Sequence, residues 1–297
     1  MIYQDYKIDK IRAGIILAIA FALLFPVFQI GERELRWDEG YYASIANEMD
    51  LKAPITRAQG EILASYPLYP WCVAVLYKIS PSIFKYELGL RIVSVLSILA
   101  ISIAVWETTR RASDDESAIV AVASMISTIT IIEKGLDGYP DMLGQFFIFL
   151  AWMTWFRFGA VKGQWNLAWL ISLFLCGIAF FAIGWKAFIF FLFPLIFMRR
   201  PLTIWSRLKK PGFIAGILLI LCFIVFVALP SLKYSLKELP LKFDSSQNYF
   251  KQIISFPFTL FFFRLLPWSL FAWPAFCAAY QPLEKNPVFS RFLRTII

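Results

Sequence analysis

Long apolar segments recur along the whole chain, and only short polar stretches separate them. Of the 297 residues, 60% are hydrophobic and 16% are charged, and the mean hydropathy is +0.67, far above that of a typical soluble domain. Segments of about 17–25 apolar residues are long enough to cross a bilayer as helices. The polar stretches are too short to bury cores of their own. The sequence therefore predicts an all-α, polytopic transmembrane bundle that forms a single domain over residues 1–297.

The basic residues indicate how these segments are oriented. The net charge is +9, and basic doublets stand at segment ends, as in Arg110-Arg111, Arg199-Arg200 and Lys209-Lys210. Such clusters are typical of cytoplasmic loops, whereas a nucleic-acid partner would need a contiguous basic soluble face. We therefore expect no nucleic acid, and a multi-pass protein of the plasma (inner) membrane with both ends in the cytoplasm. About eight spans are predicted, at residues 13–28, 88–106, 118–132, 142–158, 169–183, 187–198, 213–229 and 256–280.

The first external loop, residues 31–65, contains an acidic pair followed by a helical pattern. If a helix begins at Asp38, four apolar residues share one face, with Glu39 mostly off that face. These four are Tyr42, Ile45, Ala46 and Met49. A helix of this kind lies in the membrane interface instead of crossing it. Residues 66–79 contain two prolines and are too short for a clear span, so they are predicted to be a second interfacial or re-entrant piece.

Four acids are expected at one membrane face. Asp38 and Glu39 belong to the first external loop, and Asp137 and Asp141 to the second external turn. Acids beside a bilayer are costly unless they line an aqueous cavity, so they are candidates for function. Asp38 or Asp141 alone would equally suit a helix cap.

Thiolate and imidazole metal ligands are not expected. The chain has no histidine, and its four cysteines lie far apart within apolar stretches, where a cysteine is usually a small buried residue. No cofactor can be assigned with certainty. A divalent cation here would need carboxylate and water ligands, which magnesium and manganese prefer.

Several motifs, in one order and spacing, are similar to those of a known superfamily. They are WDEGYYASIANEM (37–49), SYPLYPW (65–71), Leu90-Arg91, YPDMLGQFF (139–147), GWKAFIFFLFP (184–194) and LLPWSLF (265–271). Together they resemble the glycosyltransferase C superfamily, in particular the branch of the bacterial lipid A aminoarabinose transferases and the protein O-mannosyltransferases. The resemblance implies an integral membrane enzyme whose donor is a sugar on a polyprenyl phosphate. Its acceptor would be a lipid, glycan or protein at the periplasmic or outer face, and membrane lipids would surround it.

The resemblance also implies roles for particular residues. Asp38 would be the carboxylate that orients or deprotonates the acceptor, with Glu39 and Asp141 as further catalytic acids. The predicted substrate-binding residues are Arg91, Lys186, Tyr42, Tyr69 and Asp137.

Two departures from the family pattern leave alternatives open. Ser65 stands where the family has a lysine that faces the donor phosphate, and longer members have a C-terminal external domain. The chain would thus be either a complete short protein or the front part of a longer one. Candidates to replace the lysine are Lys186, Arg91, Lys233, Lys237, Lys242 and Lys251. One alternative to an enzyme is a non-catalytic subunit that binds the lipid carrier. Another is a transporter, but transporters usually place their ionisable groups near the bilayer midplane, whereas the acids here are expected in loops and at span ends.

Overall fold

The computed structural model describes residues 34–49, 57–58, 61–62, 66–81, 86–112, 115–197, 204–205 and 207–235. The predicted spans at 13–28 and 256–280 lie outside the described residues, as do Ser65, Lys237, Lys242 and Lys251.

The described part is almost entirely helical, as the sequence predicts. Its helices are α2 (Trp37–Glu48), α3 (Leu68–Ile79), α4 (Tyr86–Ala112), α5 (Asp115–Ile126), α6 (Ile129–Leu136), α7 (Asp141–Trp155), the π-helix η2 (Phe156–Val161), α8 (Trp165–Ile183), α9 (Lys186–Ile196) and α10 (Pro211–Ser235). Two short strands, β1 (Arg57–Ala58) and β2 (Glu61–Ile62), form an antiparallel pair in which Arg57 is opposite Ile62.

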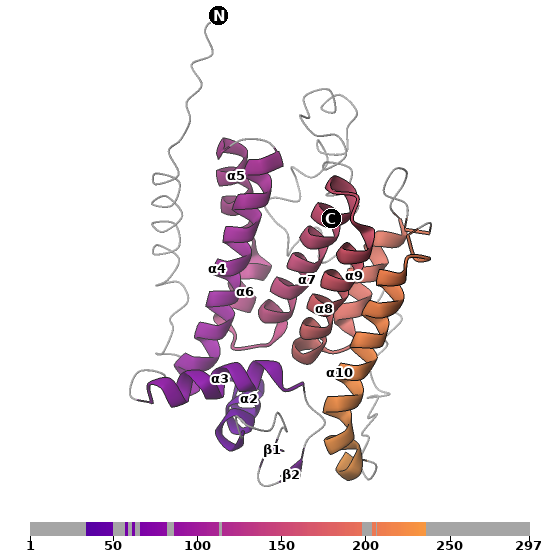
Figure 1. The fold of residues 1–297 in the computed structure, drawn as a ribbon. Coiled ribbons are helices and arrows are strands. Elements are labelled where there is room, and N and C mark those ends of the chain that lie inside the picture. The colour runs from indigo at the N-terminus through magenta and orange to yellow at the C-terminus, as the bar shows by residue number, and fades with distance from the viewer. Residues whose placement is uncertain are drawn as a thin grey trace, which may run out of the picture.

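Most of the long helices run side by side, and the shorter α2 and α3 lie at one end of them (Figure 1). We call this end the α2 end. The small β1–β2 pair lies there too, whereas the connection between α7 and α8 is at the opposite end (Figure 1). Close packing of α7 on α8 forms the centre of the bundle: Gly144 of α7 faces the side chain of Ile183, and the Trp155 and Trp169 rings are 5.9 Å apart between centroids.

Two helices in the described ranges are long and apolar enough to cross a membrane. They are Glu87–Arg111 within α4 and Trp165–Ile183, which is α8. Both contain a predicted span and extend beyond it at one or both ends. The total of about eight spans and the interfacial position of α2 and α3 remain predictions.

One predicted span is broken in the structure, and another continues as a helix beyond its predicted end. The span predicted at 118–132 is broken, because α5 ends at Ile126 and α6 begins at Ile129. Ser127 and Thr128 donate hydroxyl hydrogen bonds to the carbonyls of Ala123 and Ser124, and such bonds compete with the backbone pattern of a helix. The predicted stop at Pro230 is wrong as well, because α10 continues to Ser235. A proline removes one backbone hydrogen bond, which a long helix can tolerate.

Candidate functional site

The first turn of α2 sets the position of the acidic pair. The helix begins at Trp37 and its N-cap is Arg36, so the prediction that Asp38 caps the helix is wrong. Glu39 is the third helical residue, and its carboxylate accepts a hydrogen bond of 2.9 Å from the Arg36 amide. This is the return half of a capping box, which satisfies an amide at the helix start. The Asp38 backbone is therefore fixed in the first turn, where the helix dipole favours an ionised acid; its side chain lies outside the described part.

Glu39 forms a buried ion pair with Arg91 of α4. The two side chains are 0% and 1% exposed, and Arg91 Nη2 is 3.2 Å from Glu39 Oε2 while Nε is 3.3 Å from Oε1. Arg91 Nη2 also donates to the carbonyl of Glu34. Burial raises the pKa of Glu39, but the hydrogen bonds from Arg91, Arg36 and Gly138 and the Arg91 charge outweigh it and lower that pKa overall. Glu39 is therefore ionised and sequestered, contrary to its predicted place off the buried face of α2.

The turn between α6 and α7 closes over this pair. The amide of Gly138 donates a hydrogen bond of 2.8 Å to Glu39 Oε1, and Arg36 Nη1 lies 2.9 Å from both carboxylate oxygens of Asp137. A Cβ atom on residue 138 would be 2.7 Å from Leu90 Cβ, so only glycine lets the turn approach this closely. We call Arg36, Glu39, Arg91, Asp137 and Gly138 the Glu39 cluster.

Asp141 lies beside the Glu39 cluster and pairs with a lysine. Asp141 is the first residue of α7, whose N-cap is Pro140, so Asp141 is not a cap either. Its carboxylate is 2.7 Å from Lys134 Nζ, with side-chain exposures of 38% and 34%. The same ammonium lies 5.1 Å from the centroid of the Tyr139 ring. This acid and its lysine are therefore open to a ligand in a way that Glu39 and Arg91 are not.

Three tyrosines from three segments meet next to the cluster. The Tyr42 ring is 5.6 Å from Tyr69 and 6.4 Å from Tyr139 between centroids, both edge-on. Tyr69 is fully buried and donates to the Leu90 carbonyl at 2.9 Å. The predicted binding residues Tyr42 and Tyr69 thus lie next to the acids, and their binding role stays a prediction.

Lys186 is at the same end of the bundle but apart from the Glu39 cluster. It is exposed at the start of α9, directly after a turn in which Gly184 has a φ of 69° and packs on the ring of Tyr66. Tyr66 directly precedes the α3 segment that also contains Tyr69. Within the described ranges no hydrogen bond or ion pair joins Lys186 to the cluster.

Arg36, Lys134 and Gly138 were not among the predicted site residues. Arg36 stands two residues before the acidic pair and Lys134 seven before Asp141, but neither spacing by itself indicates an ion pair. In the described part of the chain, no three His, Cys, Asp or Glu side chains are close enough to share a metal ion. Glu39, Asp137 and Asp141 each face a cation instead. The magnesium or manganese site therefore stays a prediction.

Comparison with known proteins defines the class of fold. The chain is similar to a solved structure described as "Crystal Structure of ArnT from Cupriavidus metallidurans bound to Undecaprenyl phosphate", with a TM-score of 0.67 at 16% sequence identity. The match covers 96% of this chain and 54% of that chain, so this chain spans about half the length of that protein. No curated protein sequence matches.

The family follows from the sequence itself. Residues 64–229, more than half of the chain, match the family described as "Dolichyl-phosphate-mannose-protein mannosyltransferase". The chain therefore belongs to this family of the glycosyltransferase C superfamily and is a membrane protein, which confirms the resemblance seen in its motifs.

Proposed function

We propose that this protein transfers a sugar from a polyprenyl-phosphate carrier to a lipid, glycan or protein acceptor at the non-cytoplasmic face of the plasma membrane. Membership of a glycosyltransferase family supports the class of reaction, and the similar structure is of a protein bound to undecaprenyl phosphate. The observation that carries the proposal is the Glu39 cluster. It holds the first turn of α2, with Asp38, against the turn that leads to Asp141.

The reaction is a single displacement at the anomeric carbon. An acceptor oxygen attacks that carbon as its bond to the carrier phosphate breaks, the configuration inverts, and polyprenyl phosphate leaves. The acceptor proton passes to the Asp38 carboxylate. A phosphate is already a good leaving group, so the site needs positive charge near it more than a strong general acid.

Burial divides the charged residues into two roles. Glu39 and Arg91 are positioning residues, because they are sealed from solvent and pair with one another. The family has a phosphate-facing lysine at the position of Ser65. Arg36 and Lys134 are the better candidates to supply this positive charge, since 59% of the Arg36 side chain and 34% of the Lys134 side chain are exposed. Lys186 is a third, contributed by the α8–α9 turn. Asp141 supports Asp38, and Asp137 orients Arg36.

A transfer assay with radiolabelled sugar on polyprenyl phosphate tests the proposal. Asp38→Asn should lower kcat by about 10²–10⁴-fold, the usual contribution of a positioned base, with unchanged thermal unfolding. Asp115→Asn is the matched control, because Asp115 begins α5 and lies 4.0 Å from Arg110, in neither the cluster nor its turns. Unchanged transfer by Asp38→Asn would remove Asp38 from the mechanism.

A second candidate is a non-catalytic subunit that binds the lipid carrier. One observation favours it: Ser65 replaces the family lysine. Purified protein that binds polyprenyl phosphate without transferring sugar to any acceptor fraction would support this candidate. A transporter would instead need a path between its two faces, whereas Glu39 and Asp141 lie in the first turns of α2 and α7.

A further inference from the structure

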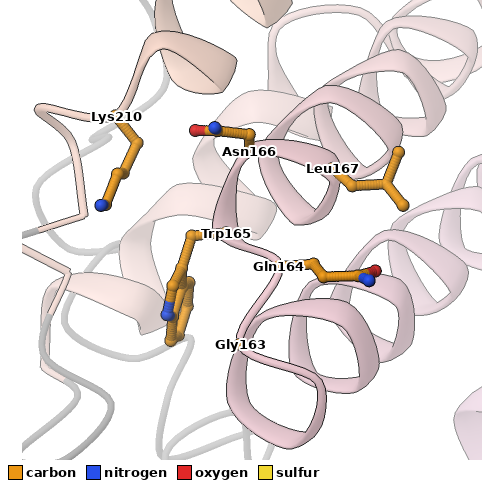
Figure 2. A pocket seen from close by; sticks show the side chains of 6 residues that line it. All are labelled: Gly163, Gln164, Trp165, Asn166, Leu167 and Lys210. Atoms are coloured by element: carbon orange, nitrogen blue, oxygen red, sulfur yellow. The ribbon is translucent and has the colours of Figure 1, made fainter.

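A second charged site lies at the end of the bundle opposite the Glu39 cluster. A pocket of about 380 Å³ is lined by Gly163, Gln164, Trp165, Asn166, Leu167 and Lys210, where the start of α8 meets the start of α10. We call it the Lys210 pocket. The Lys210 and Trp165 side chains lie on one side of the α8 start, and Gln164 points the other way (Figure 2).

The pocket is built around positive charge. Lys210 directly precedes α10, and its carbonyl accepts from the Phe213 amide at 3.0 Å, so its backbone is fixed in the helix cap. The Arg207 guanidinium lies 4.2 Å from the centroid of the Trp165 ring, so a second positive charge stands beside this lining residue. Two helix N-termini, of α8 and α10, meet here, and each is attractive to an anion. The local field therefore favours a negatively charged occupant.

No acid of the neighbouring elements can neutralise this charge. The sequence contains no Asp or Glu between Asp141 and Glu238, a range that includes all of η2, α8 and α9 and the whole of α10. Where α4 is followed by α5, Glu107 pairs with Arg110 and Arg111, and Asp115 lies 4.0 Å from Arg110. Among the side chains that the structure describes, no acid therefore balances the charge of Lys210 and Arg207.

The surface below the pocket is apolar and exposed. Leu167, which lines the pocket, and Phe174 are seven residues apart on one face of α8, and Ile214, Leu218 and Leu221 share one face of α10; these side chains are 38–58% exposed. The Phe174 and Phe223 rings, 5.9 Å apart between centroids, pack α8 against α10 beside these exposed side chains. A polar, cationic pocket next to an apolar face is complementary to a phospholipid. The pocket suits the headgroup, and the apolar face suits the acyl chains.

The position of the pocket agrees with a membrane surface. Helix α8 has 19 residues, which at 1.5 Å per residue gives a length of about 28 Å, close to the thickness of the hydrocarbon core. The pocket is at its start, and the Gly184 turn at its end packs on Tyr66 near the Glu39 cluster. Basic residues gather at the pocket end, as they do on the cytoplasmic side of membrane proteins.

We propose that the Lys210 pocket binds the anionic phosphate headgroup of a phospholipid of the cytoplasmic leaflet, with the acyl chains along the exposed apolar faces of α8 and α10. Basic pockets between membrane helices on that side are known to take such headgroups. This site is separate from the donor site of the proposed reaction.

Native mass spectrometry of the delipidated full chain, titrated with phosphatidylglycerol or phosphatidylcholine, tests this. The sharpest variant is Asn166→Asp, because Asn166 Oδ1 accepts the Gly212 amide at 3.4 Å; an aspartate keeps that acceptor and adds a negative charge. Asn166→Asp and Lys210→Gln should each weaken phosphatidylglycerol retention by about five-fold or more, as expected for one charge at a membrane surface. Lys162→Gln is the matched control: Lys162 lies over the Phe158 ring at the same end and does not line the pocket.

The outcomes distinguish a phospholipid headgroup from a free phosphate ion and from apolar packing alone. Loss of phosphatidylglycerol in both pocket variants, with the control and phosphatidylcholine binding unchanged, supports the proposal. Equal retention in all four proteins overturns it, as does an equal loss of phosphatidylcholine, which would indicate apolar packing alone. Stabilisation of the wild type against heat by inorganic phosphate, without phosphatidylglycerol binding, would make this a free-anion site and also overturn the lipid proposal.

Discussion

The Glu39 cluster and the Lys210 pocket differ in whether their charges are balanced by neighbouring residues. In the cluster each described acid faces a cation from another segment: Glu39 pairs with Arg91, and Asp137 with Arg36. At the pocket, Lys210 and Arg207 are surrounded by helices without a single acid. Charge that is balanced and buried fixes backbone positions, whereas charge that is unbalanced at a surface attracts something from outside. The cluster therefore orders the site, and the pocket recruits a partner.

The same contrast applies within the α2 end. Glu39 and Arg91 are sealed, but Lys134 and Asp141 are about one-third exposed. A sealed pair cannot exchange partners with a substrate without unfolding its surroundings, whereas an open pair can. Variants of the two pairs should therefore separate stability from activity.

The largest effect on stability is expected from Arg91→Met. It removes the Arg91 charge that faces the buried Glu39 carboxylate. Breaking a buried pair in this way costs about 3–5 kcal/mol of the free energy of unfolding. Thermal unfolding in detergent, followed by fluorescence, measures it. The control is Glu107→Gln, which removes partly exposed pairs with Arg110 and Arg111 and should cost about 0–1 kcal/mol for each pair.

The double variant Glu39→Gln with Arg91→Met sharpens this test. Because no buried charge remains, it should be more stable than Arg91→Met alone. An Arg91→Met protein that unfolds at the same temperature as Glu107→Gln would show that the buried pair does not hold α2 on α4.

The next effect is that of Gly138→Ala. The added Cβ would lie 2.7 Å from Leu90 Cβ and 3.4 Å from Glu39 Oε1, so the α6–α7 turn must move off the cluster, at a cost of about 1–3 kcal/mol. Gly40→Ala in α2 is the matched control, because nothing lies within 4 Å of its Cβ. There alanine should stabilise the helix by up to about 1 kcal/mol. Changes of the same sign in both variants would contradict the close approach of the turn.

The sequence predicted the elements of this site better than their contacts. Of the predicted apolar face Tyr42, Ile45, Ala46 and Met49, the last three are buried in the protein, because helical periodicity shows which side of a helix is apolar. Periodicity does not report which residue lies opposite. Glu39 meets Arg91, 52 residues away, and Gly138, 99 residues away, so its burial could not be read from local pattern. In the same way, the Lys209-Lys210 doublet indicated topology, but the pocket depends on α8 and α10 meeting.

The smallest effect on stability, and the clearest split from activity, is expected for Lys134→Met. Its pair with Asp141 is partly exposed, so its loss should cost no more than about 1 kcal/mol. If Lys134 contacts the donor phosphate, kcat/KM for sugar transfer should fall by about ten- to a hundred-fold, the size of one hydrogen bond to a charged group. Arg110→Met is the matched control, since Arg110 pairs with Glu107 at similar exposure near the end of α4, away from the Lys134–Asp141 pair. Equal activity in the two variants would mean that another cation at the α2 end contacts the phosphate, and Arg36 or Lys186 would be tested next. A fall in activity confined to Lys134→Met would show that the exposed Lys134–Asp141 pair contacts the substrate, while the buried Glu39–Arg91 pair beside it stabilises the fold.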